Sequence, residues 1–91
     1  MQRFFVYMLA CSDGSLYTGY TKDLERRLAL HRSGRGSKYV ASRLPVTLAY
    51  VEEVPSLKKA MQREYEIKQL GRVQKLRLCA DQKKRPRPSS R

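Results

Sequence analysis

The sequence predicts a single small α+β domain, in which helices flank a three-stranded β-sheet in the order β-β-α-β-α-α. A chain of 91 residues, 41% of them hydrophobic, can bury one core and has no room for a second. Two apolar segments near its start are joined by a turn sequence, and strand-like and helix-like segments follow with short connections. This order favours a mixed or antiparallel sheet with helices packed on it.

The first two strands are expected over residues 4–11 and 16–20, on either side of a turn at residues 12–15 that contains Asp-Gly. Aromatic and β-branched residues are frequent in the two segments, as is typical of strands. Side chains alternate between the two faces of a strand. We therefore expect Tyr7 and Tyr17 to lie near each other on one surface of the sheet.

A first helix is predicted over residues 22–32, with Thr21 as its N-cap and a mostly one-sided apolar stripe. Residues 33–38 contain two glycines and two basic side chains, so they are expected to form a flexible basic loop. A third strand is predicted over residues 46–54, where apolar and β-branched residues follow a proline.

A second helix is expected to start after Ser56 as its cap and to stop at Gly71, and a short third helix to follow over residues 72–79. The end of the chain is rich in lysine, arginine and proline and nearly lacks apolar residues. Such a composition is typical of disordered segments. The sequence thus divides into a folded domain, residues 1–80, and a disordered basic tail, residues 81–91.

The net charge of +12 predicts an anionic partner, because lysine and arginine displace counterions from polyanions. Ribosomal proteins, nucleases and proteins that bind acidic membranes share this charge, and so does a merely solvated basic face. No apolar run approaches the roughly 20 residues that span a bilayer. Two distant cysteines exclude a four-cysteine zinc site and fit a reducing cytoplasm, so a cytoplasmic location is expected.

A set of polar side chains stands out against this background. Arg27 and His31, at positions i and i+4, project from one face of the first predicted helix, directly after the strand that bears Tyr17. Glu64 falls within the apolar arc of the second predicted helix, an unusual place for a carboxylate. With Tyr7, these residues would supply a cation for phosphate, groups for proton transfer and a hard oxygen ligand for Mg²⁺.

Each of these residues also has a purely structural interpretation. The two tyrosines could pack in the sheet with satisfied hydroxyls, and Arg27 could pair with a carboxylate on its own helix. His31 could complement the dipole at the end of its helix. Glu64 could pair with Lys68 at i+4 and bend out of the interior.

Together the residues resemble the GIY-YIG nuclease superfamily, in particular its small stand-alone bacterial members and the related nucleases that cut branched DNA. The resemblance covers residues 3 to about 79. It is carried by the motifs Phe5-Val6-Tyr7, Tyr17-Thr18-Gly19, Leu24-Glu25-Arg26-Arg27-Leu28 with His31, and Arg63-Glu64.

This resemblance implies a three-stranded sheet flanked by helices and a one-metal phosphodiesterase. Glu64 would be the protein ligand of a single Mg²⁺ or Mn²⁺, and Tyr17 would be the general base or would orient the attacking water. Tyr7 would help to position that water or contact the phosphate, Arg27 would stabilise the developing charge, and His31 would relay the proton. The implied function is a metal-dependent endonuclease acting on DNA in preference to RNA, with structure-selective cleavage in DNA repair or recombination as an extension.

Further residues are candidates for contacts with the nucleic acid outside the catalytic set. Basic side chains would hold phosphates, and one aromatic ring after the glycine loop would stack on an unpaired base or pack on the sheet. These candidates are Lys22, Arg26, Arg35, Lys38, Tyr39 and Arg43. Two other functions stay open: a non-catalytic nucleic-acid-binding module on the same scaffold, and a nuclease subunit that needs a protein partner for activity or specificity.

Overall fold

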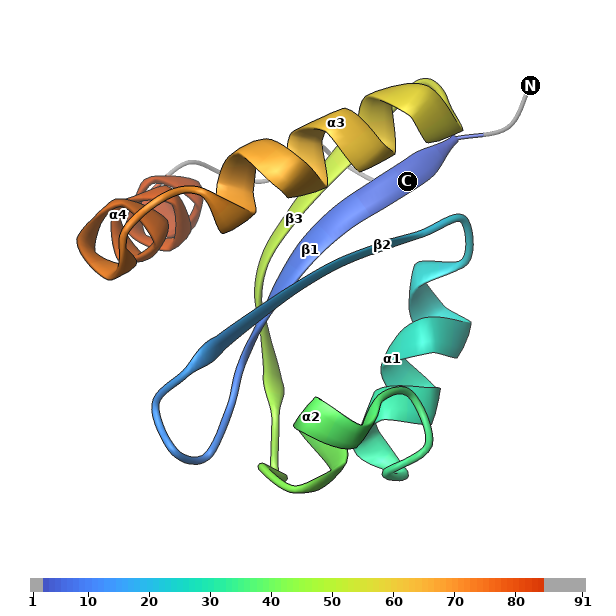
Figure 1. Ribbon diagram of the computed structural model, residues 1–91, viewed down its shortest axis with the longest axis vertical. Helices are drawn as coiled ribbons and strands as arrows, with labels where there is room; N and C mark the ends of the chain where they lie inside the picture. Colours follow the sequence, from blue (N-terminus) through green and yellow to red (C-terminus); the bar gives the residue numbers. More distant parts are fainter. Residues whose placement is uncertain (1–2, 85–91) are drawn as a thin grey trace.

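A computed structural model describes residues 3–84 and confirms the predicted α+β architecture (Figure 1). Its sheet is antiparallel throughout, with the strand order β2-β1-β3. Figure 1 shows α1 and α2 on one side of the sheet and α3 on the other, with α4 beside the far end of α3. The elements are β1 (Phe4–Ala10), β2 (Leu16–Thr21), α1 (Leu24–Arg32), α2 (Lys38–Ala41), β3 (Thr47–Val54), α3 (Leu57–Lys68) and α4 (Arg72–Lys84).

The β1–β2 turn is built as its sequence predicts. Gly14 has φ +89°, a conformation that side chains rarely adopt, so glycine is required there. Asp13 Oδ1 accepts hydrogen bonds from the Ser15 N–H at 3.0 Å and from the Ser15 hydroxyl at 2.6 Å. These bonds set the register in which Leu9 pairs with Tyr17 and Tyr7 pairs with Gly19.

Alternation along β1 produces a core on each side of the sheet. Val6 and Met8 face α3 and α4, where they pack with buried residues that include Ala60 and Ile67. Tyr7 and Leu9 face α1 and α2, in a second cluster. Because β1 is the central strand, its side chains on both faces are buried.

The helix starts differ from expectation at two places. Asp23, not Thr21, is the N-cap of α1, because its carboxylate accepts the Arg26 N–H, whereas the Thr21 hydroxyl accepts the Asp23 N–H. The predicted flexible loop 33–38 leads into α2, a four-residue helix that the sequence did not indicate. The Ser56 cap of α3 is confirmed by its bond from the Lys59 N–H.

The C-terminal part of the described chain is more ordered than predicted. The second helix was expected to stop at Gly71, but α3 ends at Lys68. The third helix was expected to end at residue 79, but α4 continues to Lys84. Residues 81–84 are therefore helical rather than part of a disordered tail, and the remainder of that tail lies outside the described residues. The side-chain amide of Gln82 exchanges hydrogen bonds with the Val51 backbone, at 2.9 and 2.6 Å, and so covers the edge of β3.

The helix α3 is tied to β3 by a group of polar residues that we call the β3 ionic cluster: Tyr50, Glu52, Arg63 and Glu66. Glu52 Oε1 accepts hydrogen bonds from the Tyr50 hydroxyl at 2.8 Å and from Arg63 Nε at 2.9 Å. Arg63 Nη1 donates to Glu66 Oε1 at 3.1 Å. The hydrogen bond and charge of Glu52 raise the pKa of Arg63 further above its usual value.

Candidate active site

The two tyrosines of the first and second strands meet on the α1 side of the sheet, as predicted. The rings of Tyr7 and Tyr17 have centroids 6.5 Å apart. Tyr7 is fully buried, whereas Tyr17 on the edge strand β2 is half-buried. A Cβ atom on Gly19 would lie 2.7 Å from the Tyr7 hydroxyl oxygen, so only glycine lets this ring pass so closely over β2. Sequence reasoning did not identify this role of Gly19.

His31, in the last turn of α1, completes a cluster of three rings. Its Nε2 lies 2.9 Å from the Tyr7 hydroxyl, and its ring centroid lies 5.3 Å from that of Tyr17 in an edge-on arrangement. The imidazole is fully buried, and its Nδ1 has no hydrogen-bond partner among residues 3–84. The backbone at Gly36 covers this nitrogen, because a Cβ atom there would lie 2.4 Å from it.

Two charges from other elements act on the Tyr7 hydroxyl. Burial raises the pKa of Tyr7 to about 12; Tyr17 and, more weakly, Glu64 on α3 add to this rise, and the Arg27 guanidinium opposes it. Burial and the positive charge of Arg27 lower the pKa of His31. At neutral pH the phenol is therefore protonated and the imidazole is neutral.

Glu64 lies in the middle of α3. Its side chain is only 22% exposed, and Oε2 forms an ion pair with Lys68 Nζ at 3.2 Å. The prediction that Glu64 pairs with Lys68 is therefore confirmed. The prediction that the carboxylate bends out of the interior is wrong, because the side chain stays mostly buried. The negative charge of Glu64 acts weakly on the Tyr7 hydroxyl, which links Glu64 to the ring cluster by electrostatics.

The donor set of this site fits a sparsely ligated divalent metal. Between residues 3 and 84, no three histidine, cysteine, aspartate or glutamate side chains are grouped so that they could enclose a metal ion. Glu64 is the partly buried carboxylate that the described part of this site offers to such an ion. Mg²⁺ commonly keeps several waters and binds through one or two carboxylates.

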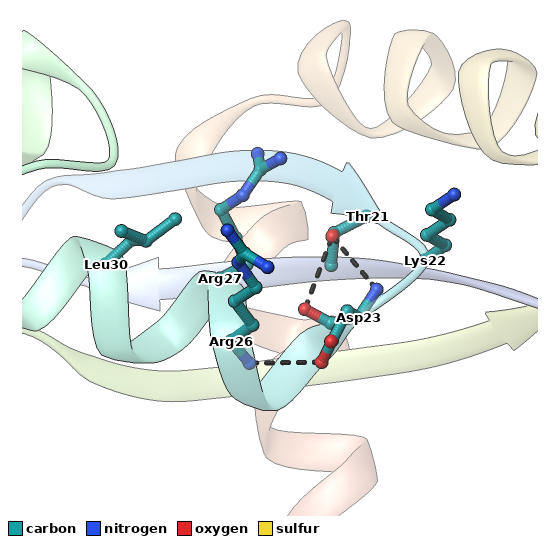
Figure 2. A pocket seen from close by; sticks show the side chains of 6 residues that line it. All are labelled: Thr21, Lys22, Asp23, Arg26, Arg27 and Leu30. Atoms are coloured by element: carbon teal, nitrogen blue, oxygen red, sulfur yellow. Dashed lines mark hydrogen bonds between the residues drawn. The ribbon is translucent and has the colours of Figure 1, made fainter.

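A basic pocket of about 250 Å³ lies next to Arg27 (Figure 2). Figure 2 shows the cationic side chains of Lys22, Arg26 and Arg27 projecting from the same side of the segment that starts α1. The carboxylate of Asp23 is turned to the helix end, where it caps the backbone. The pocket therefore brings two of the predicted phosphate contacts beside Arg27, and it is lined by Thr21, Lys22, Asp23, Arg26, Arg27 and Leu30.

The other predicted nucleic-acid contacts differ in their availability. Arg35 and Lys38 have exposed side chains in the loop after α1 and at the start of α2. Arg43 is already bound: its Nε donates to Asp13 Oδ2 at 2.9 Å, and its guanidinium carbon lies 3.7 Å from the centroid of the Tyr39 ring. The ring face of Tyr39 that Arg43 covers is not open to a base.

Two further features of the described chain concern its helices and its cysteines. No helix in it is both long and apolar enough to cross a bilayer. Cys11 and Cys79 are both buried and form no disulfide.

Comparisons with known proteins agree with the fold and with the motifs. The family model that describes the GIY-YIG catalytic domain matches residues 3–77 of this chain. A UPF0213 protein of Natronomonas pharaonis is 53% identical over 78 residues, which cover 86% of this chain and 92% of the relative. A UPF0213 protein of Staphylococcus haemolyticus is 48% identical over 81 residues, which cover 89% of this chain and 99% of the relative.

Two structures determined by NMR in solution are also similar. The UPF0213 protein BH0048 from Bacillus halodurans has a TM-score of 0.56 and 46% identity, over 86% of this chain and 83% of that one. The protein EF2693 from E. faecalis has a TM-score of 0.63 and 34% identity, over 100% of this chain and 97% of that one. The chain therefore belongs to the GIY-YIG family of nuclease domains.

Proposed function

We propose that this protein is a metal-dependent endonuclease that hydrolyses phosphodiester bonds in DNA. One observation carries the proposal: side chains from β1, β2 and α1 meet around one buried hydroxyl, on which the charge of Glu64 from α3 also acts. Membership of the GIY-YIG family and a net charge of +12 support a polyanionic substrate.

The five site residues divide into an outer and an inner layer. Tyr17, Arg27 and Glu64 are half-buried and are accessible to a phosphodiester, whereas Tyr7 and His31 are fully buried behind them. We assign the contacts with substrate and water to the outer layer. The inner layer receives the proton and fixes the geometry of the outer one.

The proposed reaction is attack of water on phosphorus with departure of one ester oxygen. Tyr17 orients the water, and Arg27 stabilises the negative charge that develops on the phosphoryl oxygens. The Tyr7 hydroxyl is protonated at neutral pH, so it is not itself the base. The neutral imidazole of His31, hydrogen-bonded to that hydroxyl, provides a base that can hold the proton removed from the water.

A divalent metal held by Glu64 would polarise the phosphoryl group and stabilise the leaving oxygen. Lys22 and Arg26, in the pocket beside Arg27, would hold a neighbouring phosphate of the same strand and so align the scissile one. We extend this proposal to structure-selective cleavage, with a role in DNA repair or recombination. A panel of DNA substrates of different structure tests the extension.

The ion pair between Lys68 and Glu64 favours a second candidate, because the cation occupies one oxygen of the proposed metal ligand. In this alternative the isolated chain binds nucleic acid without cutting it, either as a binding module or as a subunit that a protein partner activates. A domain can keep its scaffold after its chemistry is lost.

The two candidates differ in a cleavage assay. Wild type, Glu64→Ala and the control Glu66→Ala, altered two residues away on the same helix, are incubated with single-stranded, duplex, flap and branched DNA and with RNA. Each reaction contains Mg²⁺, Mn²⁺ or EDTA, and binding is measured in parallel. We expect metal-dependent cleavage by wild type and Glu66→Ala, and binding without cleavage by Glu64→Ala.

Substantial cleavage by Glu64→Ala in excess Mg²⁺ contradicts the assignment of the metal ligand. Binding without cleavage by all three proteins supports the second candidate. The assay is then repeated with candidate protein partners.

A further inference from the structure

Tyr17 is the phenol that the proposed reaction brings to the substrate, and three rings surround it. Two of them, Tyr7 and His31, are fixed in the core, with centroids 6.5 and 5.3 Å from that of Tyr17. The third, Tyr39 on α2, lies 5.9 Å away with a tilt of 31° and is 41% exposed. Tyr39 is therefore the neighbour of Tyr17 that lies nearest to solvent, in a helix of only four residues.

Tyr39 is in turn held by Arg43. The guanidinium carbon lies 3.7 Å from the centroid of the Tyr39 ring, a stacking and cation–π contact. Arg43 Nη1 also donates a hydrogen bond to the Tyr39 carbonyl at 2.9 Å and one to the Ser42 hydroxyl at 2.9 Å. One arginine thus fixes both the ring and the backbone of Tyr39.

Arg43 is anchored to the β1–β2 turn. Its Nε donates to Asp13 Oδ2 at 2.9 Å, and its carbonyl accepts the Ser12 N–H at 3.0 Å. The other oxygen of Asp13 binds Ser15, the residue directly before β2. The contacts therefore form a closed path from the turn through Arg43 and Tyr39 back to Tyr17 on β2.

We infer that Asp13, Arg43 and Tyr39 are positioning residues that hold the Tyr17 phenol in its reactive orientation; this inference rests on the proposed nuclease function. It replaces the direct contacts with nucleic acid that the sequence suggested for Arg43 and Tyr39. The charge of Arg43 is paired with a carboxylate, and the guanidinium covers one face of the Tyr39 ring. Arg43 is therefore engaged by groups of the protein itself, while the part of Tyr39 that Arg43 does not cover stays exposed.

Kinetics distinguish positioning from binding. Misplacement of a reacting group by about 1 Å lowers the rate roughly 100-fold. We therefore expect Tyr39→Ala and Arg43→Ala to lower kcat by about 10- to 100-fold with little change in KM. Tyr39→Phe keeps the ring and rescues most of kcat, whereas Arg43→Lys keeps the charge without the planar stack and rescues only part of it.

The variant Asp13→Asn distinguishes a phosphate-binding role of Arg43 from a positioning role, because the two roles predict opposite changes in DNA affinity and kcat. If Arg43 contacts a phosphate, removal of the carboxylate frees its charge, so the affinity for DNA rises and kcat does not fall. If Arg43 positions Tyr39, the same substitution releases the guanidinium and kcat falls. The amide still accepts the Ser15 bonds, which preserves the turn.

The matched controls are Arg3→Ala, which removes another arginine paired with a carboxylate, and Tyr65→Ala, which removes an exposed tyrosine on α3. Both should leave kcat and KM unchanged. Wild-type kcat in Tyr39→Ala, Arg43→Ala and Asp13→Asn would overturn the inference. So would a raised KM and a shallower salt dependence of binding, without loss of kcat, in Tyr39→Ala or Arg43→Ala.

An NMR measurement with ¹³C-labelled tyrosine keeps this test independent of the nuclease assay. The Tyr17 ring resonances should shift and broaden in Tyr39→Ala, Arg43→Ala and Asp13→Asn, but not in Arg3→Ala. Unchanged Tyr17 resonances overturn the inference even if wild type does not cleave. If the wild-type protein does not cleave but the Tyr17 resonances shift in the variants, the positioning of Tyr17 by Asp13, Arg43 and Tyr39 is supported. In that case it is the proposed nuclease function that fails.

Discussion

Two polar groups that both include residues of α3 differ in how completely their members are paired. In the β3 ionic cluster, Glu52 accepts two hydrogen bonds and Arg63 donates to two carboxylates. In the candidate site, His31 Nδ1 is buried without a partner in residues 3–84 and Glu64 pairs only with an exposed lysine. Arg63 and Glu64 are adjacent in the sequence, yet each belongs to a different group.

This difference shows how one helix can serve stability and function together. A network with every member paired stabilises a fold, whereas buried groups without partners mark places where binding capacity is retained. The 3.6-residue period of α3 turns Arg63 toward Glu52 of β3 and points the neighbouring Glu64 in a different direction. We therefore expect the two groups to respond differently to matched substitutions.

The largest contrast is expected between two glutamates. Glu64→Gln should lower kcat by about 1,000-fold or more, because it removes the charge of the proposed metal ligand. Glu52→Gln should keep kcat within about twofold and lower the free energy of unfolding by about 1 kcal/mol, because it weakens the partly exposed pair with Arg63. Cleavage rates and urea denaturation of both variants measure the two effects. A Glu52→Gln protein that is stable but inactive would contradict the assignment of the β3 ionic cluster to stability and of the candidate site to function.

The next contrast uses the two buried tyrosine hydroxyls. Tyr7→Phe removes the hydroxyl bonded to His31, and Tyr50→Phe removes the hydroxyl bonded to Glu52. Each should cost about 1 kcal/mol of stability, since Tyr7→Phe deletes a buried hydrogen bond and Tyr50→Phe a partly buried one. Only Tyr7→Phe should lower kcat, by about 100-fold, because it interrupts the proposed path of the proton. Equal activity of the two variants would remove Tyr7 from the reaction.

Most of the fold follows from local sequence signals. The Asp-Gly turn, alternation along β1 and the Ser56 cap each act over a few residues, and all three are found in the structure. The missed helix α2 has only four residues, too few to show a helical period. The helical end of α4 was missed because the docking of Gln82 on the edge of β3 depends on tertiary structure.

The site was predictable to a different degree. Spacing and the family resemblance predict Tyr7, Tyr17, Arg27, His31 and Glu64 as the site residues. The structure places the rings of Tyr7, Tyr17 and His31 next to one another, and the charges of Arg27 and Glu64 act on the Tyr7 hydroxyl. The close approaches over Gly19 and Gly36 were not predictable, because they involve atoms distant in the sequence. The pairing of Asp13 with Arg43 is likewise a contact across 30 positions, which the sequence alone does not indicate.

Two glycine substitutions compare a closely packed position in the candidate site with a position that has open space around it. Gly19→Ala introduces a Cβ atom 2.7 Å from the Tyr7 hydroxyl, and we expect it to cost about 1–3 kcal/mol of stability and to lower kcat roughly 10-fold. Gly71→Ala meets no atom closer than 3.9 Å, so its stability should stay within about 1 kcal/mol of wild type. Thermal unfolding and cleavage rates compare the two. An unperturbed Gly19→Ala protein would show that Tyr7 can move without loss.

The smallest expected effect is a pH dependence of stability that belongs to the candidate site alone. The chain has one histidine, and burial, together with the charge of Arg27, lowers the pKa of His31 from its usual 6.5. As the pH falls below 6.5, the unfolded chain binds a proton that the folded chain resists. The free energy of unfolding should therefore decrease on acidification, by at most about 1.4 kcal/mol per pH unit.

Urea denaturation at pH 7.5, 6.5 and 5.5 measures this slope in a range that lies above the titration of most carboxylates. His31→Gln should flatten the slope, because glutamine does not titrate. Glu52→Gln should leave it unchanged, because the β3 ionic cluster contains no histidine. A slope that persists in His31→Gln, or that disappears in Glu52→Gln, would show that the two groups are coupled through α3 and are not independent.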